Sequence, residues 1–149
     1  MAFNTSEFEL IKTLTDLDGI SGYEKTVRDF IKQEYLSCGC ALIHDNLGGV
    51  FAFKKSNNPN AFTVMLDAHM DEVGLIITGI TSDGFLKFTT LGGIKDCILL
   101  NSTVIINDNI KGIIGCKPVH LSSADERKNA PKKDALYIDI GATSKEEAE

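Results

Sequence analysis

The sequence predicts an α/β fold, with helices and strands in the first half and short strands in the second. Apolar residues recur at helical intervals over the first 40 residues. Residues 62–66 form a nearly continuous apolar run, typical of a strand buried on both faces of a sheet. After Val73, short apolar segments alternate with Gly, Asp and Asn, as in a small barrel or sandwich. An α/β layer followed by a β-rich region is therefore expected.

Two helices are expected first. Ser6 with Glu9, and Ser21 with Glu24, have the spacing of a capping box, in which a Ser and a Glu side chain bond each other's backbone amides. Apolar residues follow each pair at helical intervals. Gly39 stands where a glycine commonly ends a helix. We therefore predict one helix opening at Ser6 and a second opening at Ser21 and ending near Gly39.

Strand patterns follow the helices. Residues 41–44 and 50–54 flank the turn-rich run Asp45-Asn46-Leu47-Gly48-Gly49, which predicts a hairpin. Beyond Val73, strands are expected at residues 74–80, 85–90, 103–107, 111–116 and 136–140. Turns are expected at Ser82-Asp83-Gly84 and Asp108-Asn109, a helical turn at residues 123–128, and a further helix opening with Ser144 as cap and Glu147 at its third position.

Composition and charge exclude several classes of function. Hydrophobic residues make up 43% and charged residues 24% of the 149 residues, the balance of a globular protein. The net charge is -6 and Lys and Arg are scattered, so no basic stripe for nucleic acid is present. Charged or polar residues interrupt every apolar run before bilayer length, which argues against a membrane partner. Residues 1–17 lack a secretory signal pattern, so a cytoplasmic location is expected.

The chemistry of the chain is concentrated in Leu66-Asp67-Ala68-His69-Met70-Asp71-Glu72. If this stretch is extended, Asp67, His69 and Asp71 point to one side, because side chains alternate along a strand. A carboxylate beside an imidazole is the arrangement that orients metal-binding histidines. The alternative is a histidine at a strand end with solvated acids beside it. The His-x-Asp motif by itself favours that second interpretation.

The longer run from Val64 to Gly74, Val-Met-Leu-Asp-Ala-His-Met-Asp-Glu-Val-Gly, resembles the metal-binding strand of the dinuclear metallo-aminopeptidases. That family includes glutamyl and deblocking aminopeptidases, TET peptidases and proteins called cellulase M or endoglucanase. Further motifs resemble the family in the same order: Gly19-Ile20-Ser21-Gly22-Tyr23-Glu24, Asp45-Asn46-Leu47-Gly48-Gly49, Asp83-Gly84-Phe85-Leu86, Leu91-Gly92-Gly93, and residues 112–121 and 139–148. The resemblance thus spans nearly all of the chain, and the family commonly has Asn in place of Gly49.

The resemblance implies a fold and an activity. Residues 1–72 would begin the α/β/α catalytic domain of a zinc peptidase, and residues 73–149 would form an inserted small β-barrel-like dimerisation domain. The implied enzyme is a metal-dependent aminopeptidase that removes N-terminal residues from peptides, using two divalent ions, zinc or cobalt, to activate water. His69 would be a metal ligand, and Asp71 the catalytic-site residue that orients it. Homo-oligomers, dimers and in complete enzymes dodecamers, are also implied.

The same resemblance implies that the chain ends before most of the active site. The family's catalytic glutamate and its remaining metal ligands lie beyond the position that matches Glu149. A zinc site takes three or four protein ligands, so these 149 residues alone are expected to be inactive. Two alternatives stay open: a non-catalytic fragment that only self-associates, and a glycosidase. The glycosidase requires two carboxylates flanking a sugar cleft, whereas the acids here surround a histidine.

Overall fold

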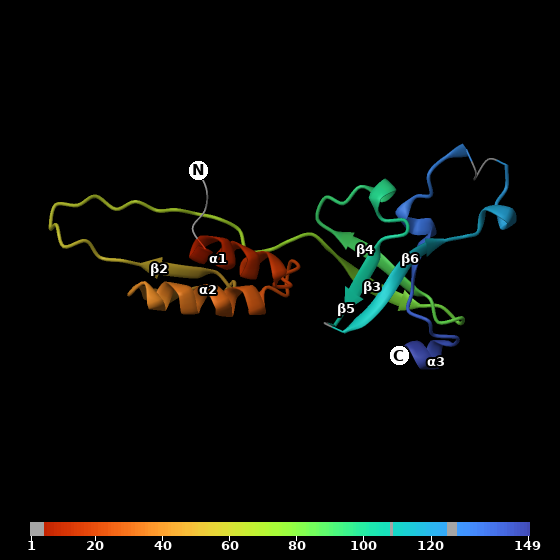
Figure 1. Ribbon diagram of the computed structural model, residues 1–149, viewed down its shortest axis with the longest axis horizontal. Helices are drawn as coiled ribbons and strands as arrows, with labels where there is room; N and C mark the ends of the chain where they lie inside the picture. Colours follow the sequence, from red (N-terminus) through yellow and green to blue (C-terminus); the bar gives the residue numbers. More distant parts are fainter. Residues whose placement is uncertain (1–4, 108, 125–127) are drawn as a thin grey trace. The chain divides into compact units, whose positions relative to one another are not determined.

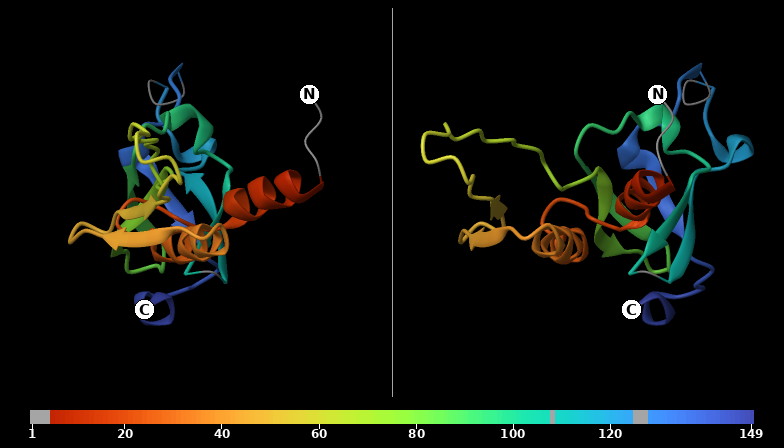
Figure 2. Two further views of the ribbon diagram at one scale, coloured as in Figure 1. Left: turned by 90° about the vertical axis from the view of Figure 1, so that its left-hand side faces the viewer. Right: turned by 60° about the vertical axis from the view of Figure 1, so that its left-hand side comes forward.

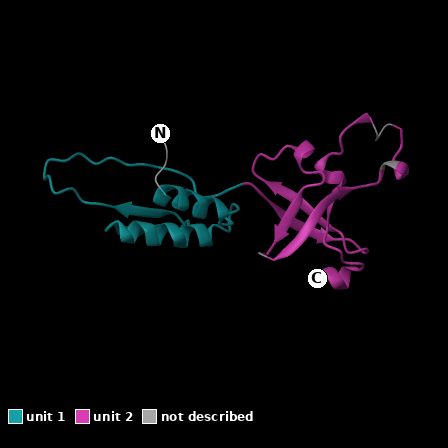
Figure 3. Cartoon of the chain, in the orientation of Figure 1, with its two compact units in different colours: residues 1–72 teal, residues 73–149 magenta. Residues whose placement is uncertain are grey.

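The computed structural model describes residues 5–107, 109–124 and 128–149. The chain divides into two compact units, residues 1–72 and residues 73–149 (Figure 3). Within the described ranges, no helix combines the length and the apolar character needed to cross a membrane. We refer to the two parts as unit 1 and unit 2. Their expected roles, as part of a catalytic domain and as a dimerisation domain, stay predictions.

Unit 1 begins with two helices, α1 (Thr5–Asp16) and α2 (Lys25–Ser37) (Figure 1). Both predicted helices are present, but both predicted capping boxes are wrong. Ser6 already lies inside α1, and the N-cap of α2 is Glu24, which makes no capping hydrogen bond through its side chain. The reason in the second case is competition for the side chains. The Ser21 hydroxyl donates to Asp71, and the Glu24 carboxylate accepts from the Gly22 amide at 2.6 Å.

The C-terminal end of α2 follows the prediction. Gly39 has φ 71°, in the left-handed region that glycine enters without a steric penalty. The Gly39 amide donates to the Leu36 carbonyl at 2.9 Å, and the Cys40 amide donates to the Tyr35 carbonyl at 3.1 Å. These two bonds form a Schellman motif, which satisfies carbonyl groups that the helix leaves unpaired. The chain then turns directly into the first strand.

A hairpin follows α2, as predicted. Strands β1 (Ala41–His44) and β2 (Val50–Phe53) pair antiparallel, with Ala41 opposite Phe53. The Asp45 carboxylate closes the connection between them. Its Oδ1 accepts hydrogen bonds from the Leu47 amide at 3.0 Å and the Gly49 amide at 2.7 Å, so a single side chain organises the turn.

The buried strand predicted at residues 62–66 is absent. The chain between β2 and β3 runs as a long extended loop with no strand pairing before residue 72 (Figures 1 and 2). Phe62 is 86% exposed and Leu66 is 94% exposed. The apolar composition of this run is that of a buried strand, but burial requires neighbouring strands on both sides. Among the described residues, none pairs with it.

Unit 2 is a curled, five-stranded antiparallel sheet (Figure 2). Its strands, in the spatial order β3-β4-β7-β6-β5, are β3 (Gly74–Ile80), β4 (Leu86–Leu91), β7 (Leu136–Asp139), β6 (Ile110–Cys116) and β5 (Thr103–Ile106). All five predicted strands are present with ends shifted by one residue at most. The predicted Ser82-Asp83-Gly84 turn joins β3 to β4.

The core of unit 2 lies under the middle of the sheet. Its buried side chains are Leu86, Leu99, Ile114, Leu136 and Ile138. Strand β7, which lies between β4 and β6, supplies two of them. Short 3-10 turns at Asp96–Ile98, Val119–Leu121 and Lys133–Ala135 connect the strands. The predicted turn at Asp108-Asn109 and the helical turn at residues 123–128 fall partly outside the described residues.

The helix predicted to open at Ser144 is also present. Helix α3 (Lys145–Ala148) has Ser144 as its N-cap, and the Ser144 hydroxyl accepts from the Glu147 amide at 3.3 Å. The Glu147 carboxylate reaches back to Thr143, whose amide and hydroxyl both donate to Oε2 at 2.8 Å. A local capping pattern therefore predicts this helix start correctly, because nothing distant competes for its side chains.

Candidate functional site

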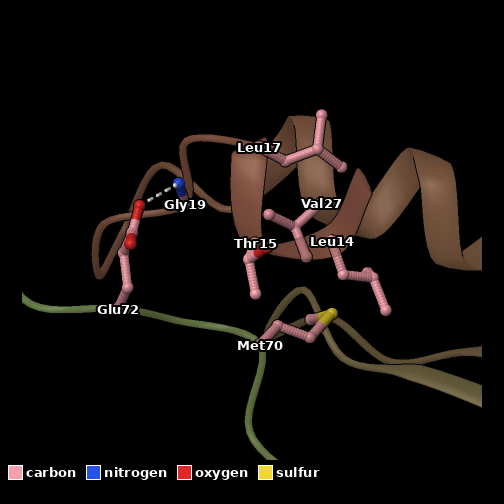
Figure 4. A pocket seen from close by; sticks show the side chains of 7 residues that line it. All are labelled: Leu14, Thr15, Leu17, Gly19, Val27, Met70 and Glu72. Atoms are coloured by element: carbon pink, nitrogen blue, oxygen red, sulfur yellow. Dashed lines mark hydrogen bonds between the residues drawn. The ribbon is translucent and has the colours of Figure 1, made fainter. Parts of the chain in front are cut away.

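The candidate site lies where the end of the extended segment meets the turn between α1 and α2. Ile20 and Glu72 form a parallel β-bridge. The Glu72 amide donates to the Gly19 carbonyl at 2.8 Å, and the Gly19 amide donates to the Glu72 carboxylate at 3.1 Å (Figure 4). Backbone and side chain of Glu72 thus both bind Gly19. This double contact sets the register between the two segments.

Gly19 is the point of closest approach in this junction. A Cβ atom at that position would lie 2.6 Å from Cγ2 of Val27, closer than side chains pack. Val27 is the one buried hydrophobic residue of unit 1 among those described. Figure 4 shows Leu14, Val27 and Met70 around a shallow hollow beside it. Glycine at position 19 therefore allows the turn before α2 to pack against Val27.

The register brings three polar side chains together: Ser21, Asp71 and His69. The Ser21 hydroxyl donates to Asp71 Oδ2 at 2.5 Å, and Asp71 Oδ1 lies 3.0 Å from His69 Nδ1. His69 Nδ1 is also 2.9 Å from the Asp71 backbone carbonyl oxygen. Each oxygen of the Asp71 carboxylate therefore has its own donor, one from each side of the junction.

These contacts determine which ring nitrogen of His69 carries the hydrogen and which one presents its lone pair. Both partners of Nδ1 are oxygen atoms that only accept, so Nδ1 carries a hydrogen. In the neutral ring, Nε2 then presents its lone pair. The His69 side chain is 85% exposed and that of Asp71 is 41% exposed, so the ring is open to solvent. The ring is oriented as metal-binding histidines usually are, with a carboxylate behind it.

The charge of Asp71 follows from the same hydrogen bonds. Donation from Ser21, and then from His69, holds the pKa of the Asp71 carboxyl below its ordinary value of 3.8. Asp71 is therefore ionised at neutral pH and acts as an acceptor on both oxygens. The donor set fits one protein ligand of a metal site, an imidazole with its orienting carboxylate.

The structure brings together His69 and Asp71, which the sequence predicts to be close. Asp67 is exposed and outside this group, and Glu72 binds Gly19 instead. Ser21 belongs to the group and was not predicted to, because its spacing to Glu24 indicated a helix cap. Within the described ranges, no three His, Cys, Asp or Glu side chains are grouped so that they could hold a metal ion.

Comparison with known proteins places this geometry in context. Residues 48–149 match the model of the M42 glutamyl aminopeptidase family. The lysyl aminopeptidase of Pyrococcus furiosus is 32% identical over 148 residues, covering 96% of this chain and 42% of that protein. The TET aminopeptidase of a marine-sediment archaeon of the Thaumarchaeota superposes with a TM-score of 0.81 at 38% identity, covering 96% of this chain and 41% of that chain.

A third relative is the TET1 peptidase of Pyrococcus horikoshii, which can assemble into a tetrahedron or a large octahedral shell. It superposes with a TM-score of 0.76 at 36% identity, covering 95% of this chain and 42% of that chain. The chain spans about 40% of the length of the curated relatives that it matches. Since the family match covers more than half of the 149 residues, the chain belongs to the M42 glutamyl aminopeptidase family.

Proposed function

We propose that the chain is the N-terminal part of a metal-dependent aminopeptidase, in which His69 binds a divalent ion through Nε2. The observation that carries this proposal is the contact between His69 Nδ1 and Asp71 Oδ1 at 3.0 Å. It leaves the opposite nitrogen of an exposed ring free. Two of the three relatives described above are named as aminopeptidases and the third as a peptidase, and the contact lies inside the segment that the family match covers.

Two divalent ions, zinc or cobalt, would lower the pKa of a water molecule and polarise a peptide carbonyl. His69 would hold one of them, and Asp71 would keep the proton on Nδ1 and the ring in place. We propose that the other ligands come from residues beyond these 149. A catalytic zinc site takes three protein ligands, so the isolated chain should hydrolyse no peptide.

Two variants test the assignment in a longer form of the protein that hydrolyses aminoacyl-p-nitroanilides. His69→Ala should lower the metal content and remove most activity without unfolding the protein. Asp71→Asn should lower activity by about 10–100-fold with less metal loss, because Asp71 acts through His69. His44→Ala is the matched control, since His44 lies exposed on β1 and outside the group. Full metal content and full rate in His69→Ala would show that the ligand assignment is wrong.

We also propose that unit 1 is part of the catalytic domain and that unit 2 mediates self-association. Ile105 on β5 and Ile113 on β6 lie on the outward face of one hairpin, and they are 63% and 56% exposed. The inward residues of the same strands pack on the core. Exposed apolar patches of this kind mark protein interfaces. The shell assembly of the Pyrococcus horikoshii peptidase supports a homo-oligomer.

Sedimentation tests this proposal. The chain, of 16.2 kDa, should plateau at twice its mass, because a symmetric interface consumes both copies of the patch. The double variant Ile105→Glu with Ile113→Glu should remain monomeric. Ile43→Glu is the control, since Ile43 is 55% exposed on β1 of unit 1. A monomer at every concentration, or growth without a plateau, would contradict the proposal.

Two alternatives are separated by the same measurements. A non-catalytic fragment would self-associate in the same way, but a longer form would then contain no metal and show no chelator-sensitive peptidase activity. A glycosidase would need two carboxylates that flank a sugar. The Asp71 carboxylate is bonded to Ser21 and His69, and Glu72 is bonded to Gly19, which favours metal binding over sugar hydrolysis. The cytoplasmic location stays a prediction.

A further inference from the structure

The hydroxyl of Ser21 has a role that neither the helix nor the backbone contacts require. Helix α2 begins four residues later, at Lys25, and its N-cap is Glu24. The register of the junction is set by the Ile20–Glu72 bridge and by the two bonds between Gly19 and Glu72. The Ser21 hydroxyl instead donates to a carboxylate 50 residues away in sequence.

We propose that Ser21 is a positioning residue for His69: its hydroxyl fixes the Asp71 carboxylate so that Oδ1 faces His69 Nδ1 and Nε2 stays free for a metal ion. This inference deepens the proposed function and rests on His69 as a ligand. Two contacts to the Asp71 carboxylate link Ser21 to His69. The Ser21 hydroxyl donates to Asp71 Oδ2 at 2.5 Å, and Asp71 Oδ1 lies 3.0 Å from His69 Nδ1.

A second donor is needed because the Asp71 carboxylate is otherwise free to rotate. The terminal torsion of an Asp side chain is broad, so one hydrogen bond to His69 leaves the carboxylate plane poorly defined. Asp71 is 41% exposed and His69 is 85% exposed, so water competes for the same atoms. Ser21 comes from the other segment of the junction, which the bridge holds in register. Its bond therefore fixes the carboxylate relative to the turn between α1 and α2, a segment to which residues 69–71 do not belong.

The contacts from Ser21 through Asp71 to His69 predict a specific tautomer of the His69 ring. With Asp71 held, Nδ1 of the neutral ring carries the hydrogen, and Nε2 does not. Without the Ser21 hydroxyl, water competes with Asp71 Oδ1 for Nδ1, the Asp71 backbone carbonyl at 2.9 Å remains as an acceptor, and the hydrogen is held less strongly on that nitrogen. The ring then presents Nε2 as a lone pair for a smaller fraction of the time. A change in the ratio of the two tautomers is therefore the direct signature of positioning.

The test compares Ser21→Thr with Ser21→Val, because Thr and Val have the same shape and differ in the hydroxyl. Long-range proton–nitrogen NMR on the chain labelled with nitrogen-15 in histidine reports the tautomer of each ring. It is run at a pH high enough that the ratio of the two tautomers no longer changes with pH. The chain has three histidines, and His69→Gln identifies the signal of interest. Ser37→Ala is the control, since the Ser37 hydroxyl bonds a carbonyl within α2.

Wild type, Ser37→Ala and Ser21→Thr should show His69 with the hydrogen on Nδ1. In Ser21→Val the ratio of Nδ1–H to Nε2–H should fall by about tenfold, the effect of losing a hydrogen bond to a charged group. His44 and His120 should not change. The same tautomer in Ser21→Thr and Ser21→Val would overturn the proposal. Loss of α2 helicity in Ser21→Val, measured by circular dichroism, would also overturn it, because the hydroxyl would then be structural.

The two hypotheses fail separately. The tautomer measurement uses no metal, so it reports on Ser21 whether or not His69 is a ligand. Full metal content in a longer form carrying His69→Ala would overturn the ligand assignment while leaving the tautomer result intact. Conversely, the His69 tautomer ratio could be the same in Ser21→Thr and Ser21→Val while His69→Ala loses metal. That result would overturn the positioning role of Ser21 and leave the proposed function standing.

Discussion

The two units of the chain bury their apolar side chains to very different extents. In the described part of unit 2, five hydrophobic residues form one buried cluster, and Ile114 is fully covered. In the described part of unit 1, Val27 is the one buried hydrophobic residue, while Phe62, Val64 and Leu66 are 66% to 94% exposed. The difference arises from connectivity. The strands of unit 2 are neighbours in one sheet, whereas the apolar run of unit 1 has no strand beside it.

This comparison indicates that the units differ in how far they are stabilised by their own residues. Buried apolar surface is the main favourable contribution to folding, and it must offset the entropy lost when the chain is ordered. Unit 2 has a core of its own. In unit 1, hydrogen bonds, including those between Gly19 and Glu72 beside the candidate site, join the end of the extended segment to the turn between α1 and α2. The residues proposed to bind metal thus lie in the less buried unit.

Limited proteolysis should show the largest difference between the units. Chymotrypsin should cut after Phe62 and Leu66 well before it cuts after Leu86 or Phe88 in β4. The protease needs an extended, unpaired backbone, which residues 62–66 offer and β4 does not. Mass spectrometry of a digestion time course measures the order of cleavage. First cuts within β4 would reverse the comparison.

Substitutions at adjacent positions of β6 should show where unit 2 is stabilised. Ile114→Ala should lower the free energy of unfolding by about 2–5 kcal/mol, because it leaves a cavity in the core. Ile113→Ala, on the exposed face of the same strand, should change it by about 0.5 kcal/mol or less. Urea unfolding followed by circular dichroism, at a concentration where the chain is monomeric, gives both values. Equal effects would mean that the sheet is not packed as described.

Gly19→Ala should weaken unit 1 without affecting unit 2. The added methyl group would lie 2.6 Å from Val27, and overpacking of this kind costs about 1–3 kcal/mol. Hydrogen exchange of the Glu72 amide, which bonds the Gly19 carbonyl, should become faster. Gly93→Ala is the control, because a Cβ there would meet no atom within 4 Å. Unchanged protection of Glu72 would show that the junction tolerates the methyl group.

The smallest effect should be a pH dependence at the start of α3. Hydrogen bonds from the Thr143 amide and then its hydroxyl lower the pKa of Glu147 from its ordinary value of 4.5. A lowered carboxyl pKa stabilises the fold above the unfolded value and loses that contribution as pH falls through the folded value. The Thr143 amide shift should therefore titrate with a midpoint below 4.5 and should not titrate in Glu147→Gln. A midpoint at or above 4.5 would contradict the contact.

Local patterns predict the elements of unit 2 well. Its strands are short, bounded by turn residues, and connected mostly to near neighbours in the chain, so the information that places them is close in sequence. The same holds for the Schellman motif at Gly39 and the cap at Ser144. In the Schellman motif and the cap, the hydrogen bonds join residues within a few positions of one another. No distant group competes for them.

Prediction fails where a distant partner decides the structure. Ser21 and Glu24 have the spacing of a capping box, but the hydroxyl bonds Asp71, 50 residues away. Residues 62–66 have the composition of a buried strand, but a strand is buried only when neighbours cover it. In both cases the local pattern is correct about what the side chains can do. Which of the available contacts they make depends on the three-dimensional arrangement.

By itself, the sequence determined the order and bounds of most helices and strands, the resemblance to the M42 family, and the proximity of His69 and Asp71. Alternation along the chain is enough for that pair, because the two residues are only two positions apart. The tertiary structure alone decided that Ser21 contacts Asp71 and that Glu72 forms two hydrogen bonds with Gly19. Those contacts depend on a register between segments about 50 residues apart, and no local pattern encodes a register of that kind.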